Sequence, residues 1–330
     1  MCDAGPAGAA AILDAEIGGA MAWTRAALGP GTGRVALTAE GLAEIDTAVA
    51  LMRANPLPAL ALSPRDFPLP ALQRTMAEVK RALDAGVGFA LLDRVPLERL
   101  SRDEAVRVYW LLGAMLARPV AQKWDGTMIY DVRDLGRPPG NGVRPDVTNA
   151  EQNFHTDNSY NLCPPEYVAL LCLHPAMDGG LHYVVSLAAA HNELRRRRPD
   201  LLPRLYRPFW FDRQREHAPG DAMAIRHPLF ERDGARLTAR LSRFQVVNGH
   251  ALAGEPLDAD GLAALDALEQ VMNGADLAAE FRFEPGQIQI VNNRVMAHRR
   301  TAFRDWPEPE RKRHLVRLWL RDAGRAFYNG

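Results

Sequence analysis

Short apolar segments alternate with turn residues through most of the chain beyond residue 85. Clusters such as Pro-Pro-Gly-Asn-Gly at 138–142 and Glu-Pro-Gly at 284–286 separate these segments. Many short strands joined by Gly- and Pro-containing turns are typical of a jelly roll or a barrel. The sequence therefore predicts a mainly β core, whose candidate strands are Gly86–Asp93, Thr127–Val132, Glu166–Leu173, His182–Ser186, Ala222–Phe230, Leu237–Arg243, Ala279–Phe283, Gly286–Val291 and Arg313–Arg321.

Helical periodicity dominates the first 84 residues. Glu40–Arg53 carries apolar residues at helical spacing, Ala71–Ala85 repeats that period, and a proline-rich joint separates the two. We expect residues 1–84 to form a helical flank packed on the core, and residues 85–330 to form the core domain of a single structural unit. Helices are also expected within the core, over Arg102–Ala117, Leu187–Arg197 and Asp260–Asn273.

The composition is that of a soluble globular protein and excludes several functional classes. Forty Lys and Arg residues balance forty Asp and Glu residues, which disfavours a general nucleic-acid binder. The longest uninterrupted apolar stretch, Tyr167–Leu173, is too short to span a bilayer, and no basic residue precedes Arg25 as a secretory signal would require. We expect a cytoplasmic protein that acts on a small molecule, without nucleic-acid or membrane partners, as a monomer or a homo-oligomer. Cys172 lies in an apolar run and is expected to be a buried free thiol.

The strongest local signal for a site is the His-Thr-Asp sequence at 155–157. Successive side chains of an extended segment point to opposite faces, so His155 and Asp157 project the same way and can hold one ion together. Such a pair is common by chance, and a metal site needs a third ligand. His298 is the candidate, because it follows the apolar strand Ile288–Val291 and would lie at the mouth of a barrel. Two imidazoles and one carboxylate are the set that holds Fe(II) with open positions; alternatively, His298 is a turn histidine bonded to the backbone.

The segment Arg313–Leu320 alternates in a way that predicts a buried cation. By period two, Arg313, Leu315, Arg317 and Trp319 share one face of a strand. If this strand is central in the sheet, both faces are buried, and Arg317 needs an anionic partner. That partner is either an internal carboxylate or a dicarboxylate cosubstrate that also reaches the metal.

Two stretches of the sequence resemble the taurine dioxygenase and clavaminate synthase branch (TauD/TfdA family) of the Fe(II)/2-oxoglutarate dioxygenases. They are FHTDNSYN with the following PPEYVALLCL, and NNRVMAHRRTAFRDWPEPERKRHLVRLWLR, and the resemblance covers residues 85–322. It implies a double-stranded β-helix, which is the jelly roll predicted above, and the use of Fe(II), 2-oxoglutarate and O2. It also implies that His155, Asp157 and His298 are the iron ligands. By the same resemblance, Arg317 pairs with the distal carboxylate of 2-oxoglutarate and Arg313 lies near its chelating end.

One position departs from the family's pattern. After Gly179-Gly180 such enzymes usually carry a Ser or Thr two positions on, whose hydroxyl helps to bind 2-oxoglutarate, and here that residue is His182. An imidazole can donate one hydrogen bond to a carboxylate. His182 therefore keeps this role, or is a core histidine, or reshapes the pocket so that the cosubstrate binds weakly or in another pose.

The resemblance implies an oxygenase that hydroxylates an unactivated C–H bond of a small polar, amino-acid-like metabolite and releases succinate and CO2. Asp157 favours hydroxylation over halogenation, because related halogenases have a small residue in its place. The alternatives are desaturation, epoxidation or cyclisation at the same iron site, a metal enzyme of this fold that does not use 2-oxoglutarate in the usual way, or a noncatalytic jelly roll. Candidate substrate contacts are Asn158, Tyr160 and Arg300, although the first two equally fit a role in holding their loop, and Trp210–Ala222 is a candidate lid.

Overall fold

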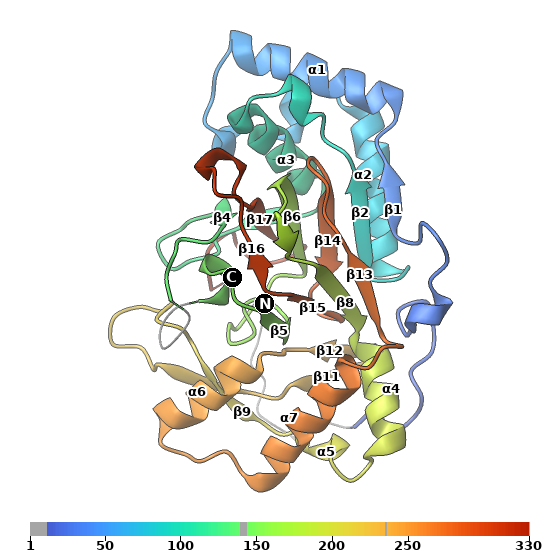
Figure 1. Cartoon of the computed structure of the whole chain (residues 1–330), viewed down its shortest axis with the longest axis vertical. Coiled ribbons are helices and arrows are strands. Elements are labelled where there is room, and N and C mark those ends of the chain that lie inside the picture. Colours follow the sequence, from blue (N-terminus) through green and yellow to red (C-terminus); the bar gives the residue numbers. More distant parts are fainter. Residues whose placement is uncertain (1–11, 139–143, 235, 330) are drawn as a thin grey trace.

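A seven-stranded sheet forms the centre of the computed structural model, which describes residues 12–138, 144–234 and 236–329. Its strand order is β1-β2-β14-β6-β17-β3, and β4 also pairs with β17 (Figure 1). The β1–β2 pair is parallel and the other pairs of this sheet are antiparallel. The strands are β1 (Arg34–Ala36), β2 (Phe89–Asp93), β3 (Arg118–Val120), β4 (Tyr130–Val132), β6 (Tyr167–His174), β14 (Ile288–Asn292) and β17 (His314–Arg321).

A four-stranded antiparallel sheet, in the order β13-β8-β15-β5, packs against the inner face of the large sheet. One core cluster joins the two sheets, since it contains Val168, Val291 and Trp319 of the large sheet and Val184, Val185 and Ala297 of the smaller one. The smaller sheet consists of β5 (Gln152–His155), β8 (His182–Ser186), β13 (Ala278–Phe281) and β15 (Met296–Arg300). Two-stranded ribbons are formed by β7 (Asp178–Gly179) with β16 (Phe303–Arg304), β9 (Phe209–Asp212) with β10 (Ala224–His227), and β11 (Phe230–Asp233) with β12 (Arg236–Ala239).

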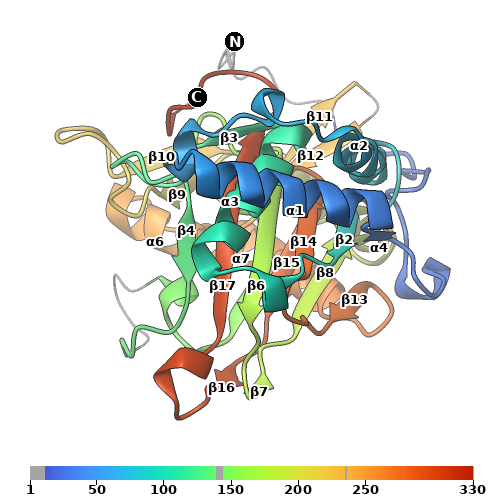
Figure 2. The same ribbon diagram turned by 90° about the horizontal axis from the view of Figure 1, so that it is seen from above.

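Helices cover both ends of this arrangement. Helices α1 (Ala39–Ala54), α2 (Pro70–Asp84) and α3 (Arg102–Leu116) pack on the outer face of the large sheet, and Figure 2 shows them from above. The others gather at the opposite end in Figure 1, and they are α4 (Leu187–Arg197), α5 (Leu202–Leu205), α6 (Arg243–Ala253) and α7 (Ala259–Met272). Among the described residues, no helix has both the length and the apolar composition needed to cross a membrane.

Strand β17 is buried along all of its eight residues, as expected of a central strand. Its alternation follows the prediction: Val316, Leu318 and Leu320 belong to the core beneath the helices, whereas Leu315 and Trp319 belong to clusters on the inner face. Period two therefore sends the side chain of Arg317 to the inner face, toward the smaller sheet.

The structure is a mixed, sheet-rich fold with flanking and inserted helices, which agrees with the coarser part of the prediction. Cys172 is a buried free thiol, as expected. Three candidate strands differ in extent, because Thr127–Val132 shortens to β4, Ala222–Phe230 splits between β10 and β11, and Leu237–Arg243 ends at Ala239 in β12. The boundary at residue 84 stays a prediction. Strand β1 of the N-terminal flank pairs with β2 of the core, so the two parts of the chain share the large sheet.

The sequence predicted neither strand β15, which carries His298, nor helix α6. Helix α6 contains Val246, Val247 and Gly249, which have low helix propensity, and its apolar residues do not form one stripe. Ser242 accepts a hydrogen bond from the backbone N–H of Gln245, three residues on. The Ser-x-x-Gln spacing of a capping box was therefore a usable signal for the start of this helix.

We predict that replacing Leu318 of β17 by Ala lowers the free energy of unfolding by about 2 to 5 kcal/mol, the usual loss for a large core side chain. Leu318 is 0% exposed and lies against Gly113 of α3. The matched control is Leu135→Ala, since Leu135 is 51% exposed. Urea unfolding followed by circular dichroism would measure both variants, and equal losses would contradict the packing described here.

Candidate metal centre

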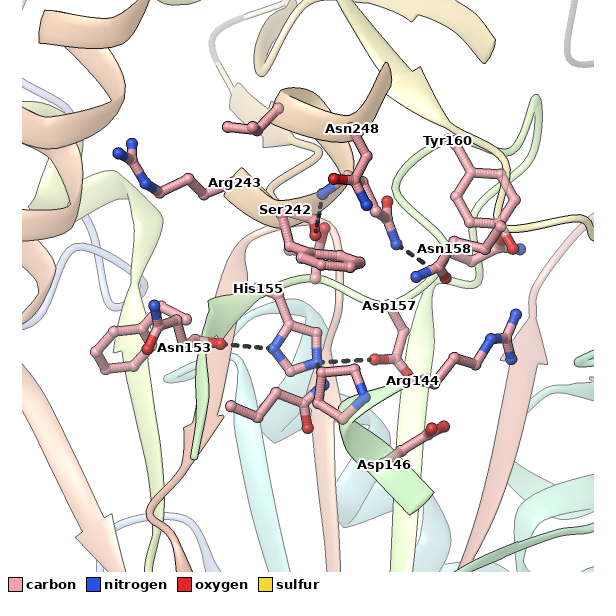
Figure 3. Close-up of a pocket in the computed structure, with 18 of the residues that line it drawn as sticks. Arg144, Asp146, Asn153, His155, Asp157, Asn158, Tyr160, Ser242, Arg243 and Asn248 are labelled. Atoms are coloured by element: carbon pink, nitrogen blue, oxygen red, sulfur yellow. Dashed lines mark hydrogen bonds and ion pairs between the residues drawn. The ribbon is translucent and has the colours of Figure 1, made fainter. Parts of the chain in front are cut away.

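Three side chains from different parts of the chain converge between the two sheets. His155 ends β5, His298 lies opposite it on β15 in the antiparallel ladder, and Asp157 follows two residues after His155. Asp157 Oδ1 is 3.3 Å from His155 Nε2 and 3.5 Å from His298 Nε2, and ligand atoms from all three residues lie within 4.8 Å of one another. Figure 3 shows the His155–Asp157 contact. The structure thus brings together the three residues that the sequence singled out as one ion's ligands.

The protonation states of these groups suit a cation. His155 Nδ1 donates to the backbone carbonyl of Asn153 over 2.9 Å, which leaves a lone pair on Nε2, the atom that faces Asp157. Burial lowers the pKa of His298, and the neighbouring His155 lowers it further. Burial alone would raise the pKa of Asp157, but Arg317, with His155 and His298 beside the carboxylate, holds it well below its usual range. The Nε2 atoms of the two imidazoles and one carboxylate oxygen therefore face one small volume, as the ligands of a divalent metal do.

The second oxygen of Asp157 is fixed by the large sheet. Asp157 Oδ2 accepts a hydrogen bond from Trp319 Nε1 over 2.7 Å and forms an ion pair with Arg317, whose NH1 lies 3.1 Å away. The backbone of Asp157 exchanges two hydrogen bonds with the side chain of Asn293, at 2.7 and 3.0 Å. These contacts leave Oδ1 for the metal, and such outer contacts orient metal ligands. Sequence reasoning missed the roles of Trp319 and Asn293, although Trp319 was placed on the same strand face as Arg317.

Arg317 is paired inside the protein, which was one of the two alternatives for it. Besides Asp157, its NH2 lies 3.5 Å from Asp146 Oδ2 and its Nε donates to Gln122 Oε1 over 2.8 Å. Its guanidinium also lies over the ring of Tyr130. Each guanidinium nitrogen of Arg317 therefore has a partner, and the side chain adjoins the three converging residues.

A small cavity of about 30 Å³ extends from these residues to a second buried arginine. Arg313 NH2 contacts His182 Nε2 over 3.1 Å. Burial lowers the pKa of His182 well below its usual value, and Arg313 lowers it further, so the imidazole is neutral and accepts this hydrogen bond. Arg313 NH1 and His182 Nδ1 are buried without a hydrogen-bond partner among the described residues. Arg300 also lines this cavity.

Two arginines of the small cavity, Arg313 and Arg300, form no ion pair among the described residues. Burial and repulsion by Arg300 together lower the pKa of Arg313 to about 9. Burial likewise lowers the pKa of Arg300 to about 10. Within the described part of the chain no carboxylate pairs with the guanidinium of Arg313. A buried charge without a partner is costly, so this cavity suits a bound anion.

The positions of the two arginines correct one expectation. Arg317 was expected at the end of the cosubstrate that lies away from the metal, and Arg313 at the metal end. The structure has the reverse order, since Arg317 contacts Asp157 while Arg313 contacts His182. The sequence indicated that both side chains share one face of β17, but it did not indicate which end of that strand meets β5 and β15.

A larger cavity of about 530 Å³ lies on the other side of the three converging residues, and Figure 3 shows its lining. Asn158 and Tyr160 line it, as expected of substrate contacts, whereas Arg300 does not. Arg300 instead donates to backbone carbonyls of Thr148 and Ala150, which fastens that loop. The candidate lid contributes Gln214 to the lining.

The wall of the larger cavity at Asn158 is held from a distant part of the chain. Asn158 has a left-handed backbone with a φ of 56°, a conformation that asparagine tolerates better than most residues. Its Oδ1 accepts a hydrogen bond from the Tyr328 hydroxyl over 3.2 Å, and that hydroxyl also bonds to the hydroxyl of Tyr160. Asn158 Nδ2 is buried and has no partner among the described residues, as is also true of Gln245 Oε1. The cavity therefore offers one free donor and one free acceptor.

Comparisons with known proteins agree with this site. The family described as taurine catabolism dioxygenase TauD, TfdA family matches residues 53–319. The FR-33289 synthase of Streptomyces rubellomurinus (strain ATCC 31215) is 31% identical over 324 residues, covering 96% of this chain and 94% of that protein. The taurine hydroxylase-like protein SAT17 of Stachybotrys chartarum (strain CBS 109288 / IBT 7711) is 26% identical over 304 residues, covering 89% of this chain and 76% of that protein.

Solved structures of similar fold are those of non-heme iron enzymes. An asparagine oxygenase in complex with Fe(II), 2S,3S-3-hydroxyasparagine and succinate has a TM-score of 0.64 at 21% identity, covering 88% of this chain and 94% of that chain. The non-heme iron oxygenase OrfP in complex with Fe and alpha-ketoglutaric acid has a TM-score of 0.61 at 17% identity, with the same coverage. The family match covers more than half of the chain, and the synthase is similar over nearly all of it. The chain therefore belongs to the taurine catabolism dioxygenase TauD, TfdA family and is an oxidoreductase of the dioxygenase type.

Proposed function

We propose that this dioxygenase hydroxylates a small, amino-acid-like metabolite with Fe(II), 2-oxoglutarate and O2. One observation carries the proposal: a buried set of two imidazoles and a carboxylate adjoins a cavity in which Arg313 forms no ion pair among the described residues. His155, Asp157 and His298 would hold the iron. When bound, Fe(II) and 2-oxoglutarate together supply an oxidant made from O2 that attacks a C–H bond, with release of succinate and CO2. The residues of this chain hold the ligands in place, exclude water and aim the substrate.

For the cosubstrate we propose the small cavity. The guanidinium of Arg313 would bind the distal carboxylate of 2-oxoglutarate, because its buried NH1 lacks a partner and a carboxylate satisfies two donors at once. His182 would keep the binding role, since its Nε2 accepts from Arg313 and its unpartnered Nδ1 then carries the hydrogen. Arg317 would act at the iron end, where it holds Asp157 in its charged form.

For the substrate we propose the larger cavity, with Asn158 and Tyr160 in its wall. The ionic side chains there are largely paired within the protein, as Arg144 is with Glu216 at 3.0 Å. Two buried polar atoms of its lining lack a partner among the described residues, the amide nitrogen of Asn158 and the amide oxygen of Gln245. A molecule that carries both an acceptor and a donor, as an amino acid or its amide does, would satisfy both. The hydroxyasparagine in the asparagine oxygenase and the hydroxyarginine in OrfP support a substrate of this class.

The finer description of the fold belongs to the same proposal. We propose that the seven-stranded and four-stranded sheets are the two halves of a double-stranded β-helix, with the metal between them. Residues 85–330 would form this dioxygenase domain, with residues 1–84 as its flank. The common core cluster of the two sheets and the position of Asp157 between β17 and β15 support this description.

The function is tested by a screen for succinate production. Purified protein is loaded with Fe(II) without oxygen, mixed with 2-oxoglutarate and a library of amino acids and their amides, and exposed to O2. We expect succinate to form in proportion to a product that has gained one oxygen atom, whereas loss of two hydrogens would indicate desaturation or cyclisation. Asp157→Ala should abolish this coupled turnover, because it removes the charged ligand. Wild-type activity in that variant would refute the metal assignment, and Asp131→Ala serves as the control on an exposed carboxylate.

Replacing Arg313 by Met should affect ligand binding and stability in opposite directions. Loss of the charge-assisted hydrogen bonds should weaken 2-oxoglutarate binding by about 10- to 100-fold. The ligand-free protein should melt at the same or a higher temperature, because a buried charge without a partner is removed. Arg321→Met is the control, since Arg321 is buried and donates to the backbone carbonyls of Cys163, Phe327 and Tyr328. That variant should lose stability and keep its affinity for 2-oxoglutarate.

His182→Ser tests the unusual residue of the small cavity. A serine hydroxyl is shorter than an imidazole, so Arg313 loses its acceptor and the cosubstrate loses a donor. We expect the KM for 2-oxoglutarate to rise by about three- to tenfold, in line with the loss of one hydrogen bond of about 1 kcal/mol. Initial rates of succinate formation at varied 2-oxoglutarate would measure it, and an unchanged KM would remove His182 from the site.

A further inference from the structure

Gln152 forms a hydrogen bond with Nε2 of His155, the imidazole nitrogen that would bind a metal. Its side-chain Nε2 lies 2.9 Å from His155 Nε2. His155 Nδ1 bears the imidazole hydrogen, since it lies 2.9 Å from a backbone carbonyl that can only accept. The lone pair is therefore on His155 Nε2, and the amide of Gln152 is the donor to it. That same nitrogen is the one that faces Asp157 Oδ1.

A β-bulge brings Gln152 to this position. Residues three apart on a regular strand point to opposite faces, so Gln152 and His155 could not meet on a regular β5. The ladder between β5 and β15 changes register between the pairs formed by His298 with His155 and by Arg300 with Gln152. Bulges of this kind re-aim side chains and are common beside active sites. The irregularity thus turns the amide of Gln152 toward the imidazole.

From this contact we infer that Gln152 is a displaceable donor, which caps His155 while the site holds no metal and is released when a metal binds. The inference rests on the proposed function, because it takes His155 as an iron ligand. A nitrogen lone pair cannot serve a hydrogen bond and a metal at once. Metal binding must therefore break the Gln152–His155 hydrogen bond and leave the amide with an unused donor.

An anion that enters the small cavity offers the released amide an acceptor. Gln152 lines both the small and the larger cavity, and so do Asp146, His155, Asp157 and Arg317. It therefore lies where the two cavities meet, beside the metal. In the small cavity Arg313 and Arg300 likewise lack anions. An oxygen of 2-oxoglutarate would accept from the freed amide, so that the metal and the cosubstrate favour each other's binding, as linkage requires of coupled ligands.

Titration with Co(II) as the probe tests this inference without turnover. The metal-free protein is prepared with a chelator, and Co(II) binding is followed by its visible absorption in wild type and in Gln152→Leu. We expect Gln152→Leu to bind Co(II) about fivefold more tightly, because the metal no longer has to break a hydrogen bond of ordinary strength. A merely structural role for Gln152 would leave the affinity unchanged or weaken it, and either result would overturn the inference.

A second titration, with 2-oxoglutarate on the Co(II)-loaded proteins, tests the fate of the amide. Gln152→Leu should bind 2-oxoglutarate about fivefold more weakly than wild type, since the freed donor is missing. An unchanged affinity would overturn the assignment of that donor to the cosubstrate. Gln73→Leu is the matched control, because Gln73 is an exposed carboxamide of α2 and lines neither cavity. It should match wild type in both titrations.

His155→Ala separates this inference from the proposed function. If that variant binds Co(II) as tightly as wild type, the metal centre itself is wrong. If His155→Ala loses Co(II) while Gln152→Leu binds it no more tightly than wild type, the centre stands and only the role of Gln152 fails.

Discussion

The buried carboxylate of Asp157 is the group on which the rest of the site depends. One of its oxygens faces the imidazoles of β5 and β15, and the other is bound by Trp319 and Arg317 of β17. The charge therefore lies between the two sheets and is stabilised from both. Without Arg317 the desolvated carboxylate would take up a proton and lose its use as a ligand, because burial disfavours the ionised form. The alternation of β17, which places Arg317 and Trp319 on one face, thus serves the metal centre directly.

Asp157 and Arg317 form a buried ion pair, whereas Arg313 is a buried cation with no carboxylate partner among the described residues. The two arginines are four residues apart, Arg313 directly before β17 and Arg317 within it, and they meet opposite environments. The charge of Arg317 is balanced by carboxylates of the protein, whereas the charge of Arg313 is balanced only when an anion is bound. The small cavity therefore holds a buried charge without a counter-ion, and a bound dicarboxylate would relieve it. Binding and stability are linked in this way in any protein whose ligand supplies a missing counter-charge.

Much of the site could be predicted because it follows from strand periodicity. His155 and Asp157 are two residues apart, and Arg313 and Arg317 share a strand face, so the sequence alone indicated that they act together. Features that depend on how distant segments meet could not be predicted. The order of the two arginines relative to the metal depends on how the two sheets are superposed, and the contact of Gln152 with His155 depends on a local change of register. Helix α6, which lines the larger cavity, has residues of low helix propensity and is held by packing against β9.

The hydrogen bond between Tyr328 and Asn158 has a consequence for how relatives diverge. Tyr328 lies beyond the residues that match the family, 53–319, yet its hydroxyl orients a side chain adjacent to the proposed iron ligand. The wall of the larger cavity is thus set partly by sequence outside the shared region, whereas the metal centre lies wholly inside it. A relative that differs in this segment would therefore differ in this wall while keeping the residues of the candidate metal centre.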